Sequence, residues 1–121
     1  MTKSVTIDAS PRLHRFYVDE ILAIKAHGNY SAVWMTDGKD ILVTRQIGKI
    51  KESIEKQCND EEHRFAKLGK SLIVNLEHVF EIELGKKPRL TLRSHKDKVC
   101  KTFEAPKDAL RDLYDCLKSK L

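Results

Sequence analysis

Basic side chains that could hold a polyanion are concentrated at the C-terminal end of the sequence. Residues 1–83 contain 12 Lys and Arg against 13 Asp and Glu, a net charge of −1. Residues 84–121 contain 11 against 5, a net charge of +6. A phosphate-facing surface fits this asymmetry, because each phosphate that a Lys or Arg neutralises releases condensed counterions. Many domains that bind no nucleic acid also have a basic end, so the charge alone leaves two interpretations.

Residues capable of catalysis or metal binding lack the spacing that either chemistry requires. The five histidines are dispersed, and Cys58, Cys100 and Cys116 form neither a CxxC pair nor a Cys/His cluster. The sequence contains no nucleophile elbow and no Gly-rich phosphate loop. We therefore expect reduced thiols, no enzyme activity, no cofactor and no metal site.

Length and composition predict one domain. The 121 residues, 40% of them apolar, suffice for a single core. The apolar runs are too short to span a bilayer, and the first twenty residues lack a signal-peptide core, so we expect a cytoplasmic protein without membrane association. Residues 1–12 are predicted to be a loosely held lead-in, and residues 13–121 the domain.

Short alternating segments predict a β-rich core with two helices. Asp37-Gly38 is expected to form a two-residue type I′ hairpin, which requires positive φ at both positions. Ile47, Ile50 and Ile54 recur at helical spacing, which predicts a helix ending near residues 58–59, followed by an acidic surface loop at 60–62. Pro106 fits the first turn of a final helix. The strands are expected at 13–18, 21–26, 30–36, 40–44, 72–74, 79–84, 89–93 and 99–103.

Four motifs in this order resemble the LytTR family of DNA-binding domains. They are Val18-Asp19-Glu20-Ile21, Gly28-Asn29-Tyr30, Asp37-Gly38 followed by the helix at Ile47–Lys56, and Phe65, Lys67 and Ser71 before Leu72-Ile73-Val74-Asn75. The resemblance covers about residues 13–117. It implies a mainly β fold, an elongated stack of small antiparallel sheets with one inserted helix and one C-terminal helix. It also implies a bacterial transcription regulator that binds double-stranded DNA sequence-specifically, through loops in successive major grooves. Family members usually follow a receiver domain. Because 121 residues are too few to include one, we expect a stand-alone version here.

The resemblance assigns the first DNA-contacting region to Asn29 and Tyr30. Asn29 could pair with an adenine edge, and Tyr30 could contact a phosphate or a thymine methyl. The alternative is structural, with Asn29 holding a turn and Tyr30 packing against the sheet.

The second region corresponds to the turn at residues 67–71. Lys67, Lys70 and Ser71 would supply its phosphate and base contacts, unless the turn is only a solvated basic segment. Family members often carry histidine at the position of Gly69, and this departure weakens any inference about base specificity.

The third region precedes the final helix, where the family commonly has a serine-arginine pair. The expected arginine is absent here, Lys107 is a nearby substitute, and Glu104 would repel phosphate. Lys101 is the other candidate for this role. Lys86, Lys87 and Arg89 form a further basic turn, whose face the sequence does not reveal.

Two alternatives concern the protein as a whole. The fold could serve as an interaction module whose basic turns hold an acidic protein partner instead of DNA. The protein could also bind repeated sites as a homodimer.

Trp34 is expected in the core rather than in a dimer patch, and Asn75 is expected to satisfy backbone groups at a strand end.

Overall fold

The protein is built mainly from short strands with two α-helices. The computed structural model describes residues 3–58, 64–95 and 98–121, and the predicted acidic loop at 60–62 lies outside these ranges. The mainly β fold with one inserted and one C-terminal helix is confirmed. Along the described chain the elements are β1 (Ser4–Ala9), β2 (Arg12–Tyr17), the 3-10 turn η1 (Val18–Glu20), β3 (Ile21–His27), β4 (Tyr30–Met35), β5 (Asp40–Val43), α1 (Ile47–Gln57), β6 (Phe65–Leu68), β7 (Leu72–Asn75), η3 (Leu76–His78), β8 (Val79–Glu83), β9 (Arg89–Arg93), β10 (Cys100–Glu104) and α2 (Lys107–Lys118).

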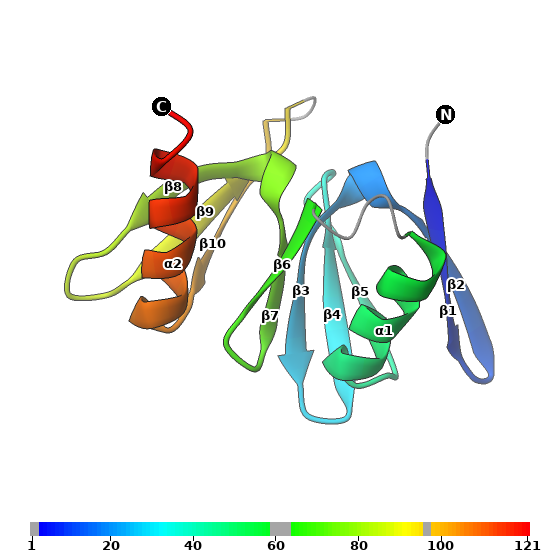
Figure 1. Ribbon diagram of the computed structural model, residues 1–121. Helices are drawn as coiled ribbons and strands as arrows, with labels where there is room; N and C mark the ends of the chain where they lie inside the picture. Colours follow the sequence, from blue (N-terminus) through cyan, green and yellow to red (C-terminus); the bar gives the residue numbers. More distant parts are fainter. Residues whose placement is uncertain (1–2, 59–63, 96–97) are drawn as a thin grey trace.

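These strands form three small antiparallel sheets within the described residues. A two-stranded sheet pairs β1 with β2, a five-stranded sheet has the order β5-β4-β3-β7-β6, and a three-stranded sheet has the order β10-β9-β8. Figure 1 shows the sheets following one another across the molecule, from the β1–β2 hairpin at one end to β8–β10 and α2 at the other. The predicted stack of small sheets is therefore confirmed.

The central sheet has a core on each face, because successive side chains of a strand point to opposite sides. A register irregularity between Ile21 and Ala23 interrupts this alternation in β3, so that Leu22 and Ala23 both belong to the same core. On one face Ile24 and Ile73 pack with the first sheet and with Ile47, Ile50 and Ile54 of α1. The other face packs against the three-stranded sheet and α2, through Leu22, Leu72, Val74, Leu90, Leu92, Leu110 and Leu113. This double burial explains why β7, whose sequence is Leu-Ile-Val-Asn, is buried along its whole length.

The prediction that the first residues are loosely held is wrong for residues 4–9. These residues form β1, in which Val5 and Ile7 are buried in the first core. Gln57 at the end of α1 fixes the strand, because its Oε1 accepts from the Thr6 N–H (2.8 Å) and its Nε2 donates to the Thr6 carbonyl (2.7 Å). The strand signal, Val5-Thr6-Ile7, is too short to identify without knowing that β2 and α1 cover it.

The turn at Asp37-Gly38 also differs from its prediction. Gly38 has a φ of +91°, but Asp37 is not in the positive-φ region, so the turn is not type I′. The Gly38 N–H donates to the Met35 carbonyl (2.9 Å) and the Met35 N–H donates to the Lys39 carbonyl (2.8 Å). Three residues therefore form the loop, and the Asp37 side chain accepts from the Lys39 N–H (2.9 Å).

Candidate nucleic-acid interface

Three segments that carry predicted contact residues lie at the same edge of the molecule. Antiparallel pairing places the end of β3 beside the start of β7, with Lys25 opposite Leu72. The Ala26 N–H donates to the Ser71 carbonyl (2.8 Å), so the β3–β4 turn and the β6–β7 turn leave the central sheet at the same side. Figure 1 shows both turns and the start of α2 along the lower edge. We call the surface formed by Gly28–Tyr30, Gly69–Ser71 and Ala105–Lys107 the turn edge.

The first turn presents two exposed polar side chains. Gly28 has a φ of +68°, and the reversal leaves Asn29 exposed at the tip. Among the described residues, the Asn29 side chain makes no hydrogen bond, so it is not needed to hold the turn. Tyr30 is 42% exposed and stacks on His27, with ring centroids 5.6 Å apart. Both side chains face solvent at the end of the sheet, and His27, on which Tyr30 stacks, is exposed beside them.

The second turn, Gly69–Ser71, contacts the third segment, Ala105–Lys107, through Gly69. This glycine has a φ of +69°, and a Cβ built on it would lie 2.8 Å from Cγ of Pro106. Both backbone conformation and space therefore select glycine at the position where the resembling family often has histidine. The departures at Gly69 and near Pro106 are one structural feature, because the proline ring occupies the space that a side chain at residue 69 would need.

The three polar residues of the second turn have different surroundings. Lys67 on the outer strand β6 and Lys70 in the turn are exposed. Ser71 is half-buried, and its Oγ accepts from Nζ of Lys25 (3.2 Å). Ser71 thus orients a lysine that sequence reasoning did not select as a site residue.

In the third segment the structure separates the two predicted lysines. Lys107 is exposed and begins α2 directly after Pro106, which is the N-cap. Lys101 lies elsewhere, with Nζ 4.1 Å from the ring centroid of Trp34. Trp34 is four residues farther along β4 than Tyr30, which is about 13 Å from the turn edge at the usual rise of a strand. The structure therefore does not bring Lys101 to the turn edge.

Trp34 packs, as expected, against the core that lies between the central sheet, the three-stranded sheet and α2. Its ring is half-buried and meets Phe103 edge-on, with ring centroids 6.3 Å apart. The Lys101 ammonium group covers the outer face of this aromatic pair. Such a cation–π contact gives Lys101 a structural role.

Two further basic positions at or near the turn edge escaped sequence reasoning. Arg45 is exposed between β5 and α1, and its carbonyl accepts from the buried Ser31 hydroxyl (2.9 Å), next to Tyr30. Lys25 lines a groove of about 520 Å³ with Lys86 and Lys87. Lys25 was overlooked because it reads as an ordinary polar position of an alternating strand; only strand pairing shows what it adjoins.

The opposite edge of the molecule is acidic. A hollow of about 860 Å³ lies there, at the far ends of β3, β4 and β7. Its charged lining groups are carboxylates and histidines, contributed by Asp19, Glu20, Asp37, Glu77, His78 and His95. Four carboxylates line this surface, which we call the acidic edge, and Arg64 pairs with two of them. The remaining negative charge disfavours phosphates, whereas the turn edge presents lysines.

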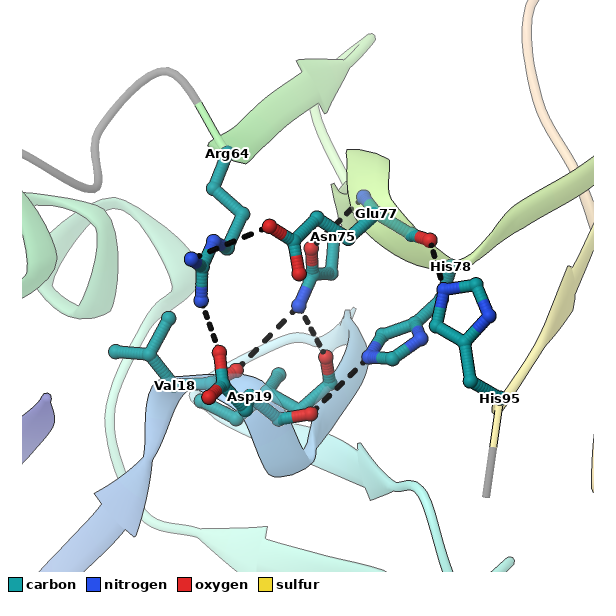
Figure 2. A network of polar contacts seen from close by, with 8 residues as sticks. Val18, Asp19, Arg64, Asn75, Glu77, His78 and His95 are labelled. Carbon is teal, nitrogen blue, oxygen red and sulfur yellow. Dashed lines mark hydrogen bonds and ion pairs between the residues drawn. The ribbon is translucent and has the colours of Figure 1, made fainter. Parts of the chain in front are cut away.

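A polar network holds the acidic edge together (Figure 2). Nδ2 of Asn75 donates to the carbonyls of Ile21 (2.9 Å) and Val18 (3.4 Å), and its Oδ1 accepts from the Glu77 N–H (3.1 Å). The predicted backbone-satisfying role of Asn75 is thus confirmed. Figure 2 also shows Arg64 bridging the carboxylates of Asp19 and Glu77.

The described residues offer neither a ligand cluster for a metal ion nor a helix suited to crossing a bilayer. Across residues 3–58, 64–95 and 98–121, no three His, Cys, Asp or Glu side chains gather as metal ligands. No helix in these ranges has the length and apolar character needed to cross a membrane.

Comparison with known proteins gives a family match and a structural match. The family model of the LytTr DNA-binding domain matches residues 11–115. Among solved structures, a "LytTr DNA-binding domain of putative methyl-accepting/DNA response regulator" from Bacillus cereus superposes with a TM-score of 0.63 and 14% identity, covering 97% of this chain and 98% of that chain. At this identity the structural likeness shows the fold alone. No curated protein matches the sequence.

Proposed function

Because this chain belongs to the LytTr DNA-binding domain family, we propose that it binds double-stranded DNA sequence-specifically through its turn edge and regulates transcription. The family is one of DNA-binding domains rather than of enzymes. In this proposal the turns enter successive major grooves, and the strands behind them act as a rigid frame. Binding to repeated sites as a homodimer and a cytoplasmic location belong to the same proposal.

The observation that carries the proposal is the contrast between the two edges. Asn29, Lys70 and Lys107 are exposed at the turn edge, whereas carboxylates line the hollow at the acidic edge. A duplex that approaches the turn edge meets hydrogen-bond donors and positive charge without facing the acidic hollow.

The side chains of the turn edge suit different contacts. The Asn29 amide can make paired hydrogen bonds with N6 and N7 of adenine, which gives sequence preference. Lysines act as point charges and suit phosphates, which position a protein without reading sequence. We therefore assign Asn29 to a base edge and Tyr30 to the neighbouring backbone or a thymine methyl. We assign Lys70 and Lys107 to phosphates, together with Lys67, which lies on β6 next to the turn edge. Ser71 positions Lys25, and Lys101 is not part of the proposed surface.

One observation favours a second candidate, an interaction module that binds an acidic protein. The contact between Gly69 and Pro106 leaves no side chain at the position where family members often have histidine. A turn edge that retains lysines but loses such a group could hold carboxylates as well as phosphates.

Selection of duplexes from a random DNA pool tests the proposal and separates the candidates. We expect a recurring sequence, with affinity that falls steeply as salt increases. Lys67→Ala and Lys70→Ala should each weaken binding to all duplexes and lower the salt slope by roughly one charge. Recovery of no preferred sequence, or equal affinity of both variants and the parent protein, would contradict the proposal.

A further inference from the structure

A basic groove lies beside the turn edge, where the central sheet meets the three-stranded sheet. Its walls are Lys25 of β3, Lys86, Lys87 and Pro88 of the β8–β9 turn, and Glu104 and Ala105 after β10. We call it the lysine groove. It adjoins the second turn through the Lys25–Ser71 hydrogen bond (3.2 Å). It adjoins the third segment through Ala105, which precedes the Pro106 that packs on Gly69.

The lysine groove carries an uncompensated positive charge. Three lysines and one glutamate line it, a formal net charge of 3 − 1 = +2. In the described part of the chain, no carboxylate lies within 4.0 Å of Nζ of Lys25, Lys86 or Lys87. Lys86 and Lys87 are exposed, whereas the Ser71 hydroxyl orients the half-buried Lys25.

The neighbouring arginine is already engaged and contributes little free charge. Arg89 donates from Nε to Oε2 of Glu83 (2.8 Å). This hydrogen bond, and then the negative charge of the Glu83 carboxylate, raise the pKa of Arg89. Arg89 also faces Glu104 across the β9–β10 pair. The lysines are therefore the cations of this region that remain available to an anion.

We propose that the lysine groove binds backbone phosphates of the same duplex that the turn edge contacts, with one phosphate contact for each of its three lysines. The inference rests on the proposed function and extends it, since it adds a phosphate site between the second and third contact segments. Ammonium groups on flexible stems suit a phosphate rather than a base edge. The groove supplies positive charge next to the segment where the family's usual arginine is absent, and Glu104 limits its strength.

The test compares two variants that each lose two positive charges from the basic half of the chain. Lys86→Ala/Lys87→Ala empties the groove of its exposed lysines. The matched control, Lys118→Ala/Lys120→Ala, acts at the far end of α2, about 16 Å along the helix from Lys107. The dissociation constant for a duplex selected by the parent protein is measured at several salt concentrations, and circular dichroism confirms that each variant is folded.

We expect the groove variant to lower the slope of log K against log salt by about 1.8, roughly 0.9 for each phosphate contact. With equal affinities of parent and variant at 1 M salt as the reference, this slope difference makes the variant's affinity in 0.1 M salt roughly 60-fold weaker. The control should keep the parent slope, and Glu104→Gln should bind more tightly than the parent. Lys25→Met, which keeps the alkyl stem, should lower the slope by about 0.9.

An unchanged slope in the groove variant, or an equal loss in the control, would overturn the lysine groove as a phosphate site. Binding of an acidic polypeptide that depends on Lys86 and Lys87, while duplex binding does not, would also overturn it. These results differ from failure of the proposed function, in which the parent protein itself binds no duplex.

Discussion

The contact between Gly69 and Pro106 gives the sharpest prediction about stability. Gly28 and Gly69 have nearly the same φ, +68° and +69°, but only Gly69 is crowded. A Cβ at Gly28 would have no atom within 4 Å, whereas at Gly69 it would lie 2.8 Å from Cγ and 3.1 Å from Cδ of Pro106. Alanine at the two positions therefore separates backbone strain from steric overlap.

The expected magnitudes follow from these two terms. Gly28→Ala should lower the free energy of unfolding by about 1–2 kcal/mol, the cost of a left-handed conformation for a residue with a Cβ. Gly69→Ala should cost the same plus about 1–3 kcal/mol of overlap, because a proline ring cannot rotate away as a flexible side chain can. Replacing Pro106 by glycine in the Gly69→Ala background should recover the second term and leave the first.

Urea unfolding followed by circular dichroism measures these differences, with the single Pro106→Gly variant completing the double-mutant cycle. Equal costs for Gly28→Ala and Gly69→Ala, together with additive effects in the cycle, would refute the steric explanation. The departure from histidine at this position would then need another cause.

Three other substitutions test separate parts of the structure. Asn75→Ala should lower the free energy of unfolding by about 1–3 kcal/mol, because it removes the side-chain hydrogen bonds to the Ile21 carbonyl and from the Glu77 N–H; a cost near zero in urea unfolding would contradict the role of the network. Asn29→Ala should relax base preference at one position by about 1–3 kcal/mol in competition between duplexes without altering the salt slope, and an unchanged preference would remove Asn29 from base contact. Lys101→Met should leave both duplex affinity and its salt slope at the parent values, so a lower slope in the mobility shift would show that the ammonium over Trp34 does reach phosphate.

Sequence patterns predicted the elements better than their mutual contacts. The period of Ile47, Ile50 and Ile54 identifies α1, and the alternation at 79–84 and 89–93 identifies β8 and β9. By contrast, the burial of β1 depends on β2 and on α1, whose Gln57 is 51 residues distant along the chain from Thr6. Local pattern carries no information about such a partner.

The candidate site shows the same division. The predicted contacts lie on turns, near strand ends or at the start of α2, and these features are visible in the sequence; they are Asn29, Tyr30, Lys67, Lys70 and Lys107. Three features of the site are tertiary contacts that local pattern does not reveal: Lys25 with Ser71, Gly69 with Pro106, and Lys101 with Trp34. The smallest of these sequence separations is 106 − 69 = 37 positions.

The most direct test of the proposed function is to map which residues of the protein a bound duplex contacts. Amide chemical shifts of isotope-labelled protein, followed by NMR during titration with a selected duplex, report both edges in one experiment. We expect large shifts at Gly28–Tyr30, Gly69–Ser71 and Lys107, and little change at Asp37, Glu77 and His78. Large shifts confined to the acidic edge, with the turn edge unchanged, would contradict the proposed function.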